Sequence, residues 1–334
     1  MSISIKNIRS ATASEWDHIW KECDYSTYFH SREWAEIWNR YTKGKMRPDP
    51  KLIMFTDGKK AILPLSYRKT LKGLVKSYIS SPAGTFGGWI STDELTVEHG
   101  KLLTNYLVDK HKNLFWRLNP YDRLAARNGI KITENDETHA LNLSDDFETI
   151  YEKWSKGGWK KGNLAPSRTA YMVRKARKYG VSVRPATTLD DWREYYQVYE
   201  DSLDRWGDRA TSHYRWELFN EIYQRNSPYT RLWLGVYDSR IIVGGLCFYA
   251  KRHAVTWHGA TLKDYFKLHP MRMLVCEMVK DACDRGYAWF DFNPSGGHEG
   301  VKAFKKSFGA QALPSPVVHI ESLPKFIRHF IVNC

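Results

Sequence analysis

Residues 286–310 combine a glycine-rich turn with a lysine-bearing helix, a pairing that could act on an anionic group. A buried strand over 287–292 is predicted to lead into the turn 293–297, which contains Gly296 and Gly297. Backbone N–H groups at a helix start, with lysines one turn further on, favour negative charge. The segment therefore suits an anionic ligand or an oxyanion that develops during a reaction. A tight turn with solvated charges would show the same spacing.

The helix after this turn has a clear apolar stripe. Val301, Phe304 and Phe308 lie at helical spacing, and Gly309 is expected to end the helix. Lys302, Lys305 and Lys306 are expected to flank the stripe.

One acid precedes the turn. Asp291 could orient a substrate amine or take its proton. A buried acid that is satisfied by backbone donors fits the sequence equally well.

Bulk composition indicates a globular protein that favours polyanions. The chain has 334 residues, of which 42% are hydrophobic and 26% charged, and its formal net charge is +14. The length favours two domains. An excess of positive charge favours nucleic acid, anionic headgroups or phosphorylated substrates as partners, although many soluble proteins are basic.

Other site classes have little support in the sequence. The five cysteines form no Cys-x-x-Cys pair, and no histidine has a neighbour at metal-ligand spacing. There is no Gly-x-Ser-x-Gly motif, secretory signal or long apolar run. We therefore expect a cytoplasmic protein without a metal site or stable membrane insertion.

An internal duplication predicts the architecture. Strand–turn–strand patterns centre on Asp57 and Asp238, and each is followed by a helical stripe, a strand and an Asn-Pro pair. The Asn-Pro pairs begin at Asn119 and Asn293, which lie 62 and 55 residues after the respective hairpin acids. The sequence thus predicts two α/β domains of common ancestry, each a mixed sheet flanked by helices.

Only the second copy continues into the glycine turn and lysine helix. We therefore place domain 1 at residues 1–150, completed by the C-terminal segment 315–334, and domain 2 at 151–314. The active surface is expected in domain 2.

The connector 153–180 carries nine Lys or Arg residues and no acid. Its second half is predicted to be a helix, with Tyr171, Met172, Ala176 and Tyr179 facing inward. Trp154 and Trp159 alternate with lysines, a combination that suits an exposed nucleic-acid end. A solvated basic helix face is the alternative. The residues expected to contact nucleic acid are Lys160, Lys161, Lys175 and Lys178.

These features resemble the FemABX-type aminoacyltransferases, which are tandem GNAT-like proteins of about this length. The resembling segments are 28–38, 172–181, 267–292 and 303–310, in this order. The resemblance implies two GNAT-like domains and transfer of an aminoacyl group from charged tRNA to an amine, classically on a peptidoglycan precursor. It implies no bound cofactor, because the aminoacyl-tRNA is a co-substrate.

The resemblance also suggests site residues. Lys305, preceded by Phe304, matches the lysine that assists at the acyl carbonyl, and arginines near Arg168 and Arg174 would contact substrate phosphates. A lysine that helps to hold the nucleotide-sugar diphosphate in classical members is replaced by Trp38, which favours a stacked or smaller acceptor.

Two alternatives remain open. One is an acyl-CoA-dependent N-acyltransferase, although His269-Pro270 stands where acetyl-CoA enzymes carry a glycine-rich pyrophosphate loop. The other is a tRNA-binding relative without catalysis. The donated group, the acceptor and the oligomeric state are not determined by the sequence.

Overall fold

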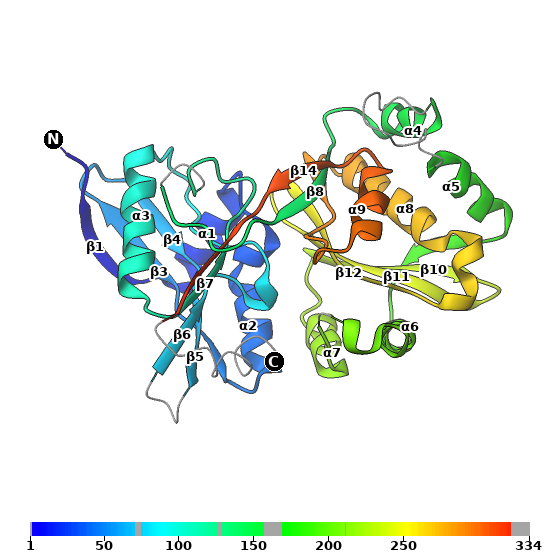
Figure 1. Cartoon of the computed structure of the whole chain (residues 1–334), viewed down its shortest axis with the longest axis horizontal. Coiled ribbons are helices and arrows are strands. Elements are labelled where there is room, and N and C mark those ends of the chain that lie inside the picture. The colour runs from blue at the N-terminus through cyan, green and yellow to red at the C-terminus, as the bar shows by residue number, and fades with distance from the viewer. Residues whose placement is uncertain (1, 71–74, 126–128, 157–168, 211, 322–334) are drawn as a thin grey trace. The chain divides into compact units, whose positions relative to one another are not determined.

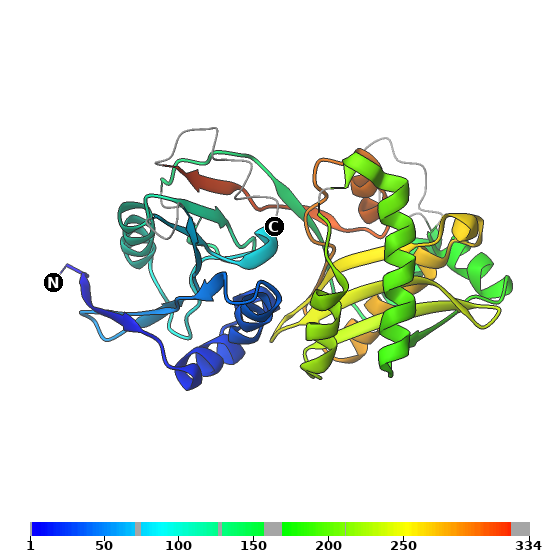
Figure 2. The ribbon, with the colours of Figure 1, turned by 90° about the horizontal axis from the view of Figure 1, so that it is seen from below.

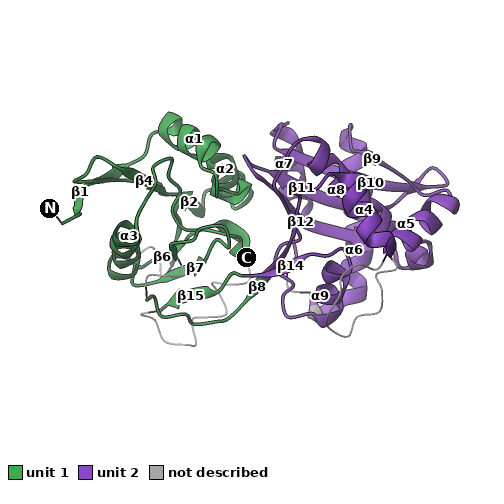
Figure 3. Cartoon of the chain, turned by 90° about the horizontal axis from the view of Figure 1, so that it is seen from above, with its two compact units in different colours: residues 1–137, 314–334 green, residues 138–313 purple. Residues whose placement is uncertain are grey.

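The computed structural model describes residues 2–70, 75–125, 129–156, 169–210 and 212–321 (Figure 1). The chain divides into two compact units, residues 1–137 with 314–334 and residues 138–313 (Figure 3). The division falls before Thr138, whereas the sequence placed it after residue 150. The reason is that residues 140–142 pair with a strand of the second unit.

The first unit contains a three-stranded and a five-stranded sheet, with strand orders β1-β3-β4 and β15-β7-β6-β5-β2. Its strands are β1 (Ile5–Ser10), β2 (Met46–Pro48), β3 (Lys51–Phe55), β4 (Lys60–Leu63), β5 (Ser66–Thr70), β6 (Val75–Ile79), β7 (Leu114–Arg117) and β15 (Val317–Ile320). Its helices are α1 (Ala13–Glu22), α2 (Arg32–Tyr41) and α3 (Val97–Lys110).

Prolines explain why this unit has two sheets. Pro64 separates β4 from β5, and Pro50 separates β2 from β3. A proline has no backbone N–H and cannot continue a ladder through the middle of a sheet. The hairpin strands β3 and β4 next to Asp57 therefore lie in the three-stranded sheet, whereas β2 and β5, beyond the two prolines, pair in the five-stranded sheet.

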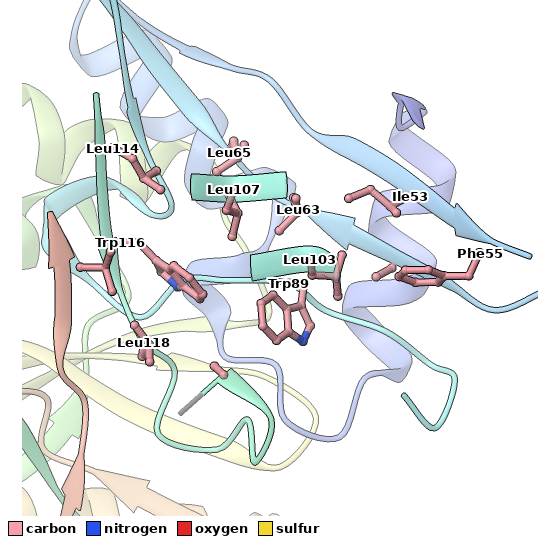
Figure 4. Close-up of a cluster of buried hydrophobic side chains, with 13 residues drawn as sticks. Ile53, Phe55, Leu63, Leu65, Trp89, Leu103, Leu107, Leu114, Trp116 and Leu118 are labelled. Atoms are coloured by element: carbon pink, nitrogen blue, oxygen red, sulfur yellow. The ribbon is translucent and has the colours of Figure 1, made fainter. Parts of the chain in front are cut away.

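The core of the first unit lies where α3 packs on the strands (Figure 4). Leu103 and Leu107 of α3 meet Trp89, Trp116 and strand residues, all fully buried. Burying such side chains contributes roughly 1.5–3 kcal/mol each. This core holds the strand that ends just before Asn119.

The second unit contains one seven-stranded sheet of order β14-β8-β13-β12-β11-β10-β9, with helices on both faces (Figures 1 and 2). The strands are β8 (Glu137–Asn142), β9 (Ser182–Pro185), β10 (Thr230–Tyr237), β11 (Arg240–Tyr249), β12 (His253–Thr261), β13 (Trp289–Asp291) and β14 (Gln311–Pro314). The helices are α4 (Phe147–Lys156), α5 (Thr169–Lys178), α6 (Leu189–Trp206), α7 (Trp216–Gln224), α8 (Pro270–Asp284) and α9 (Glu299–Lys306).

Local signals account for the helix that crosses this sheet most closely. Thr188 accepts a hydrogen bond from the Asp191 backbone N–H at 3.1 Å and starts α6 with a capping box. Gly244 of β11 lets α6 approach, because a Cβ there would lie 2.2 Å from the Tyr195 ring. The helix can therefore lie directly on the strand.

The two units repeat one order of elements, which confirms the two mixed α/β, GNAT-like domains expected from the duplication. Each runs from a strand through two helices to antiparallel strands, then a helix, then a strand parallel to the last one. Both predicted hairpins are present, at Asp57 and Asp238. The parallel pairs are β6 with β7 and β12 with β13.

Strand β12 pairs with β13 over only part of its length. The parallel register covers His253–Val255, whereas β12 continues to Thr261. The two strands therefore part beyond Val255, and the chain leaving β13 enters the turn at Asn293.

Candidate functional site

The turn after β13 carries a lysine folded back onto it. Lys305 Nζ donates to Asn293 O at 2.5 Å and to Ser295 Oγ at 2.9 Å. Both oxygens belong to uncharged groups, so the lysine brings positive charge to the turn. We call Asp291, Asn293, Ser295 and Lys305 the Lys305 site.

Lys305 is buried, contrary to the expected orientation of its helix. It is 5% exposed, whereas Val301 is 41% exposed. Phe308 is buried and Phe304 half-buried, so only part of the predicted apolar stripe faces inward. The helix is rotated because the carbonyl and hydroxyl of the turn provide acceptors for an ammonium group, and a buried charge without partners would be very costly.

Asp291 holds the backbone of the same turn. Its side chain is 0% exposed, and Oδ1 accepts from Thr138 Oγ1 at 2.5 Å and from the Asn293 N–H at 2.6 Å. A carboxylate so enclosed does not reach a substrate amine in this arrangement. The geometry favours a positioning role, in which Asp291 holds the backbone N–H of Asn293, the residue whose own carbonyl binds Lys305.

Asn293 is the strained residue of the site. Its φ of 61° lies in the left-handed region, which asparagine tolerates better than most residues. Its Oδ1 atom is buried and has no hydrogen-bond partner among the described residues. A buried acceptor left without a partner costs about 1–3 kcal/mol. Such an atom beside a buried lysine is typical of a site that a ligand completes.

Arg272 contacts the C-terminal end of α9. Its Nη1 donates to Ser307 Oγ at 2.8 Å and to Thr169 Oγ1 at 2.9 Å, and its guanidinium lies 5.1 Å from the Phe304 ring centroid. Burial lowers the pKa of Arg272 from its usual value. This arginine ties the starts of α5 and α8 to the end of α9 and fixes Phe304 beside Lys305.

Gly296 and Gly297 supply the backbone conformation of the turn. Both are exposed with φ of 56° and 79°, values that glycine adopts without strain. The helix that follows begins with Glu299, whose carboxylate pairs with Lys302 at 3.0 Å. An acid at the first helical position disfavours an anion there. The positive charge of the site therefore comes from Lys305 and not from the helix start.

The start of α8 offers few backbone donors to an anion. Pro270 lacks an N–H, and the N–H groups of Arg272 and Met273 both donate to His269 O, at 3.1 and 3.4 Å. His269 itself has a φ of 56°. At these three positions no backbone N–H is therefore free to bind a pyrophosphate.

Trp38 lies in the first unit and packs within α2. It is 2% exposed, and its ring meets Trp34 and Tyr41 edge-on at 5.7 and 5.4 Å between centroids. It is a core side chain here, and its role in binding an acceptor stays a prediction.

The basic connector is described at residues 153–156 and from Thr169 onward. Lys160, Lys161 and Arg168, as well as Trp159, lie outside the described residues. Trp154 is fully buried and donates through Nε1 to Phe308 O at 2.8 Å, so it is no stacking platform.

The orientation expected for α5 is partly wrong. Val173 and Ala176 face inward, together with Thr169 and Ala170, whereas Tyr171 and Tyr179 are exposed. Small side chains let α5 pack closely on α4 and α8, and the two tyrosines remain outside. Arg174 and Lys178 are exposed and Lys175 is half-buried, which leaves their predicted contacts with substrate and nucleic acid possible.

The Asn-Pro pairs served only as markers of the duplication in the sequence, and Ser295, Thr138 and Arg272 were not identified from it. Ser295 could have been found, because a hydroxyl ten residues before a lysine flanks the same glycine turn. Thr138 and Arg272 come from distant segments, and no local pattern marks them.

Comparison with protein families identifies the class of domain. Residues 167–306 match the family described as acetyltransferase (GNAT) domain. The match covers most of the second unit and includes the whole Lys305 site, and it assigns this part of the chain to the acyltransferases of the GNAT kind. No curated protein matches the sequence.

Solved structures extend the likeness to both units. The crystal structure of FemX has a TM-score of 0.70 at 14% identity and covers 98% of this chain and 100% of its own. L-PGS from Bacillus licheniformis has a TM-score of 0.57 at 10% identity, with coverage of 97% and 96%. A tandem GNAT protein from the clavulanic acid biosynthesis pathway has a TM-score of 0.50 at 9% identity, with coverage of 95% and 99%. The chain thus shares the tandem GNAT fold with the crystal structure of FemX, as its sequence motifs predicted.

Two other kinds of site are absent from the described ranges. No helix there has the length and apolar character needed to cross a bilayer. No three His, Cys, Asp or Glu side chains in those ranges gather as metal ligands would.

Proposed function

We propose that the protein transfers an aminoacyl group from a charged tRNA to an amine acceptor, forming an amide bond. The observation that carries this proposal is the buried Lys305, held over the turn after β13 by Asn293 O and Ser295 Oγ. Its charge is fixed before the reaction, as electrostatic stabilisation of an oxyanion requires. The FemABX resemblance supports the aminoacyl donor and implies Phe304-Lys305 as the motif at the acyl carbonyl.

The reaction needs no covalent enzyme intermediate. The amine nitrogen attacks the ester carbonyl, the new C–N bond forms, and the C–O bond to the tRNA ribose breaks. The proton lost by the amine goes to the departing ribose oxygen, directly or through solvent. An ester is already activated, so positioning and stabilisation of the oxyanion by Lys305 are the main contributions of the protein.

Asp291 acts on this chemistry through the backbone. Its bond to the Asn293 N–H orients the residue whose carbonyl holds Lys305. We assign to the unpartnered Asn293 Oδ1 the role of accepting an N–H of the incoming amine once the substrate occupies the turn, because a buried acceptor without a partner would gain one. The acceptor class is a small amine or peptide, including a peptidoglycan precursor.

A second candidate is an N-acyltransferase that uses an acyl-CoA. The match of residues 167–306 to the acetyltransferase family favours it. The start of α8 speaks against it, because Pro270 has no N–H and two neighbouring amides bond to His269 O. Calorimetry with CoA, acyl-CoA and charged tRNA separates the two donors, and tight binding of CoA alone would favour the second candidate.

The decisive variant is Lys305→Met, with Lys306→Met as its matched control. Lys306 lies next to it on α9 but is exposed. We expect Lys305→Met to lower kcat by about 10²–10³, because one oxyanion donor is lost, and Lys306→Met to stay near wild type. The assay is single-turnover formation of the amide from charged tRNA, followed by mass spectrometry.

Turnover of Lys305→Met within about threefold of wild type would show that this lysine is not the oxyanion donor. Strong tRNA binding by the wild type without any acyl transfer would instead indicate a relative that has lost catalysis.

A further inference from the structure

The outer face of α5 joins exposed aromatic rings to unpaired positive charge. Tyr171 is 55% and Tyr179 42% exposed, and these are two of the five large hydrophobic side chains that are exposed in the described part of the chain. Between them lie Arg174, Lys175 and Lys178. We call these five residues the α5 face.

The charges of this face are not neutralised. Arg177, on the neighbouring stripe, pairs with Glu277 of α8 at 3.4 Å. Arg174, Lys175 and Lys178 form no ion pair within the described residues, and α5 itself contains no acid. Three like charges within about two helical turns repel one another, so a polyanion bound there would stabilise the arrangement.

The rings are presented for stacking. The Lys175 ammonium lies 5.5 Å from the Tyr179 ring centroid, which holds that ring beside the charges. Tyr171 and Tyr179 are eight positions apart, or about 12 Å along a helix axis. They are too far apart to sandwich one base and suit two separate unpaired bases.

We propose that the α5 face binds the single-stranded 3′ end of the donor tRNA, with Tyr171 and Tyr179 as stacking platforms and Arg174, Lys175 and Lys178 on the phosphates. This inference rests on the proposed function, since it names the part of the donor that touches the second unit. Base stacking on aromatic side chains requires unstacked bases, which a duplex stem does not offer. The exposed tyrosines therefore favour the unpaired end over the stem.

Binding of uncharged tRNA tests the proposal independently of catalysis. The probes are a fluorescent tRNA transcript, the same transcript lacking its unpaired 3′ nucleotides, and a blunt RNA hairpin, titrated at several salt concentrations. We expect Tyr171→Ala/Tyr179→Ala to weaken binding of the intact transcript by about tenfold or more. The salt slope should not change, because no charge is removed. The truncated transcript and the hairpin should be affected within about twofold.

Charge removal should have the complementary effect. Arg174→Gln/Lys178→Gln should lower the salt slope by roughly one to two phosphate contacts for all three RNAs. Phe266→Ala and Lys263→Gln/Lys267→Gln are matched controls, because these exposed residues lie in the 3₁₀ helix Lys263–Leu268 of the same unit. They should leave both affinity and slope unchanged.

Three results would overturn the proposal. The first is intact-transcript affinity of the tyrosine variant within twofold of wild type. The second is an equal loss on the blunt hairpin. The third is tyrosine-dependent binding to vesicles of phosphatidylglycerol and phosphatidylcholine without tyrosine-dependent RNA binding, which would assign the face to a membrane surface. Lys305→Met should bind all three RNAs as wild type does, so a failure of the catalytic proposal would be seen separately.

Discussion

The two Asn-Pro turns occupy the same place in the two units but are held in opposite ways. Each asparagine stands two residues after the parallel strand, β7 or β13. Asn119 donates through Nδ2 to Tyr25 O at 2.7 Å, and its Oδ1 accepts from the Tyr121 N–H at 3.2 Å. Asn293 has a left-handed backbone and a buried Oδ1 without a partner among the described residues.

This comparison distinguishes an asparagine with a structural role from one with a proposed functional role at the same position of the repeated order of elements. A side chain whose polar atoms are both satisfied locks a turn in place, and Asn119 does this in the first unit. A strained residue with an unsatisfied acceptor destabilises the fold by itself, and proteins retain such features mainly at functional sites. Since the second turn also binds Lys305, the function proposed above places the chemistry there.

The largest expected effect concerns the acid that follows the first turn. Asp122 is buried and accepts from the Leu124 N–H at 2.9 Å. Burial raises the pKa of Asp122 from 3.8 to about 6. The folded state therefore holds this proton more tightly than the unfolded chain, and stability is lost as pH rises through about 4 to 6.

Asp122→Asn should remove this loss. The free energy of unfolding of the variant, relative to wild type, should rise by about 3 kcal/mol between pH 4 and pH 7, since the shift is about two units. Denaturant titrations monitored by tryptophan fluorescence at several pH values measure it. If the difference in unfolding free energy between the variant and wild type does not change with pH, Asp122 does not have the raised pKa that its burial implies.

How much of this contrast could be predicted from the sequence depends on the range of the interactions. The hairpins at Asp57 and Asp238 and the repeated Asn-Pro pairs were visible because turn residues and spacing are local signals. The inward face of α9 was not, because Val301 and Lys305 both belong to plausible stripes. Lys305 faces inward because Asn293 and Ser295 provide hydrogen-bond acceptors, and these acceptors come together only in the folded turn.

Long-range pairing was also beyond the sequence. β8 follows the first copy along the chain but pairs with β13, and although the C-terminal segment was expected to complete domain 1, the pairing of β15 with β7 was not predicted. No periodicity distinguishes such exchanges from ordinary strand order. For the same reason Thr138, on β8, could not be recognised as the partner of Asp291.

The second prediction tests Asp291 as a positioning residue. Asp291→Asn keeps the shape but removes the charge that strengthens the bonds from Thr138 and the Asn293 N–H. We expect a loss of about 2–3 kcal/mol in stability, because hydrogen bonds to charged groups are the strong ones. Activity should fall as the turn loosens, while the pH dependence of kcat keeps its shape. A profile that loses its acidic limb would instead identify Asp291 as the proton acceptor.

The smallest effects come from changing the two asparagines themselves, and they test the contrast most directly. Asn119→Ala leaves Tyr25 O and the Tyr121 N–H without their partner, so it should destabilise the protein by about 2 kcal/mol. The kcat of this variant should stay within about twofold, because the turn has no lysine. Its stability is measured by denaturant titration and its activity by the single-turnover assay.

Asn293→Gly should give the reverse pattern. Glycine accepts the φ of 61° without strain, and no described hydrogen bond to Oδ1 is lost, so stability should change by less than about 1 kcal/mol. Loss of one hydrogen bond to the incoming amine should lower kcat about tenfold. If Asn293→Gly is instead destabilised as much as Asn119→Ala and keeps full activity, the second asparagine is scaffold like the first. Lys305 would then act without the Asn293 side chain, and the unsatisfied Oδ1 would lose its assignment to the acceptor amine.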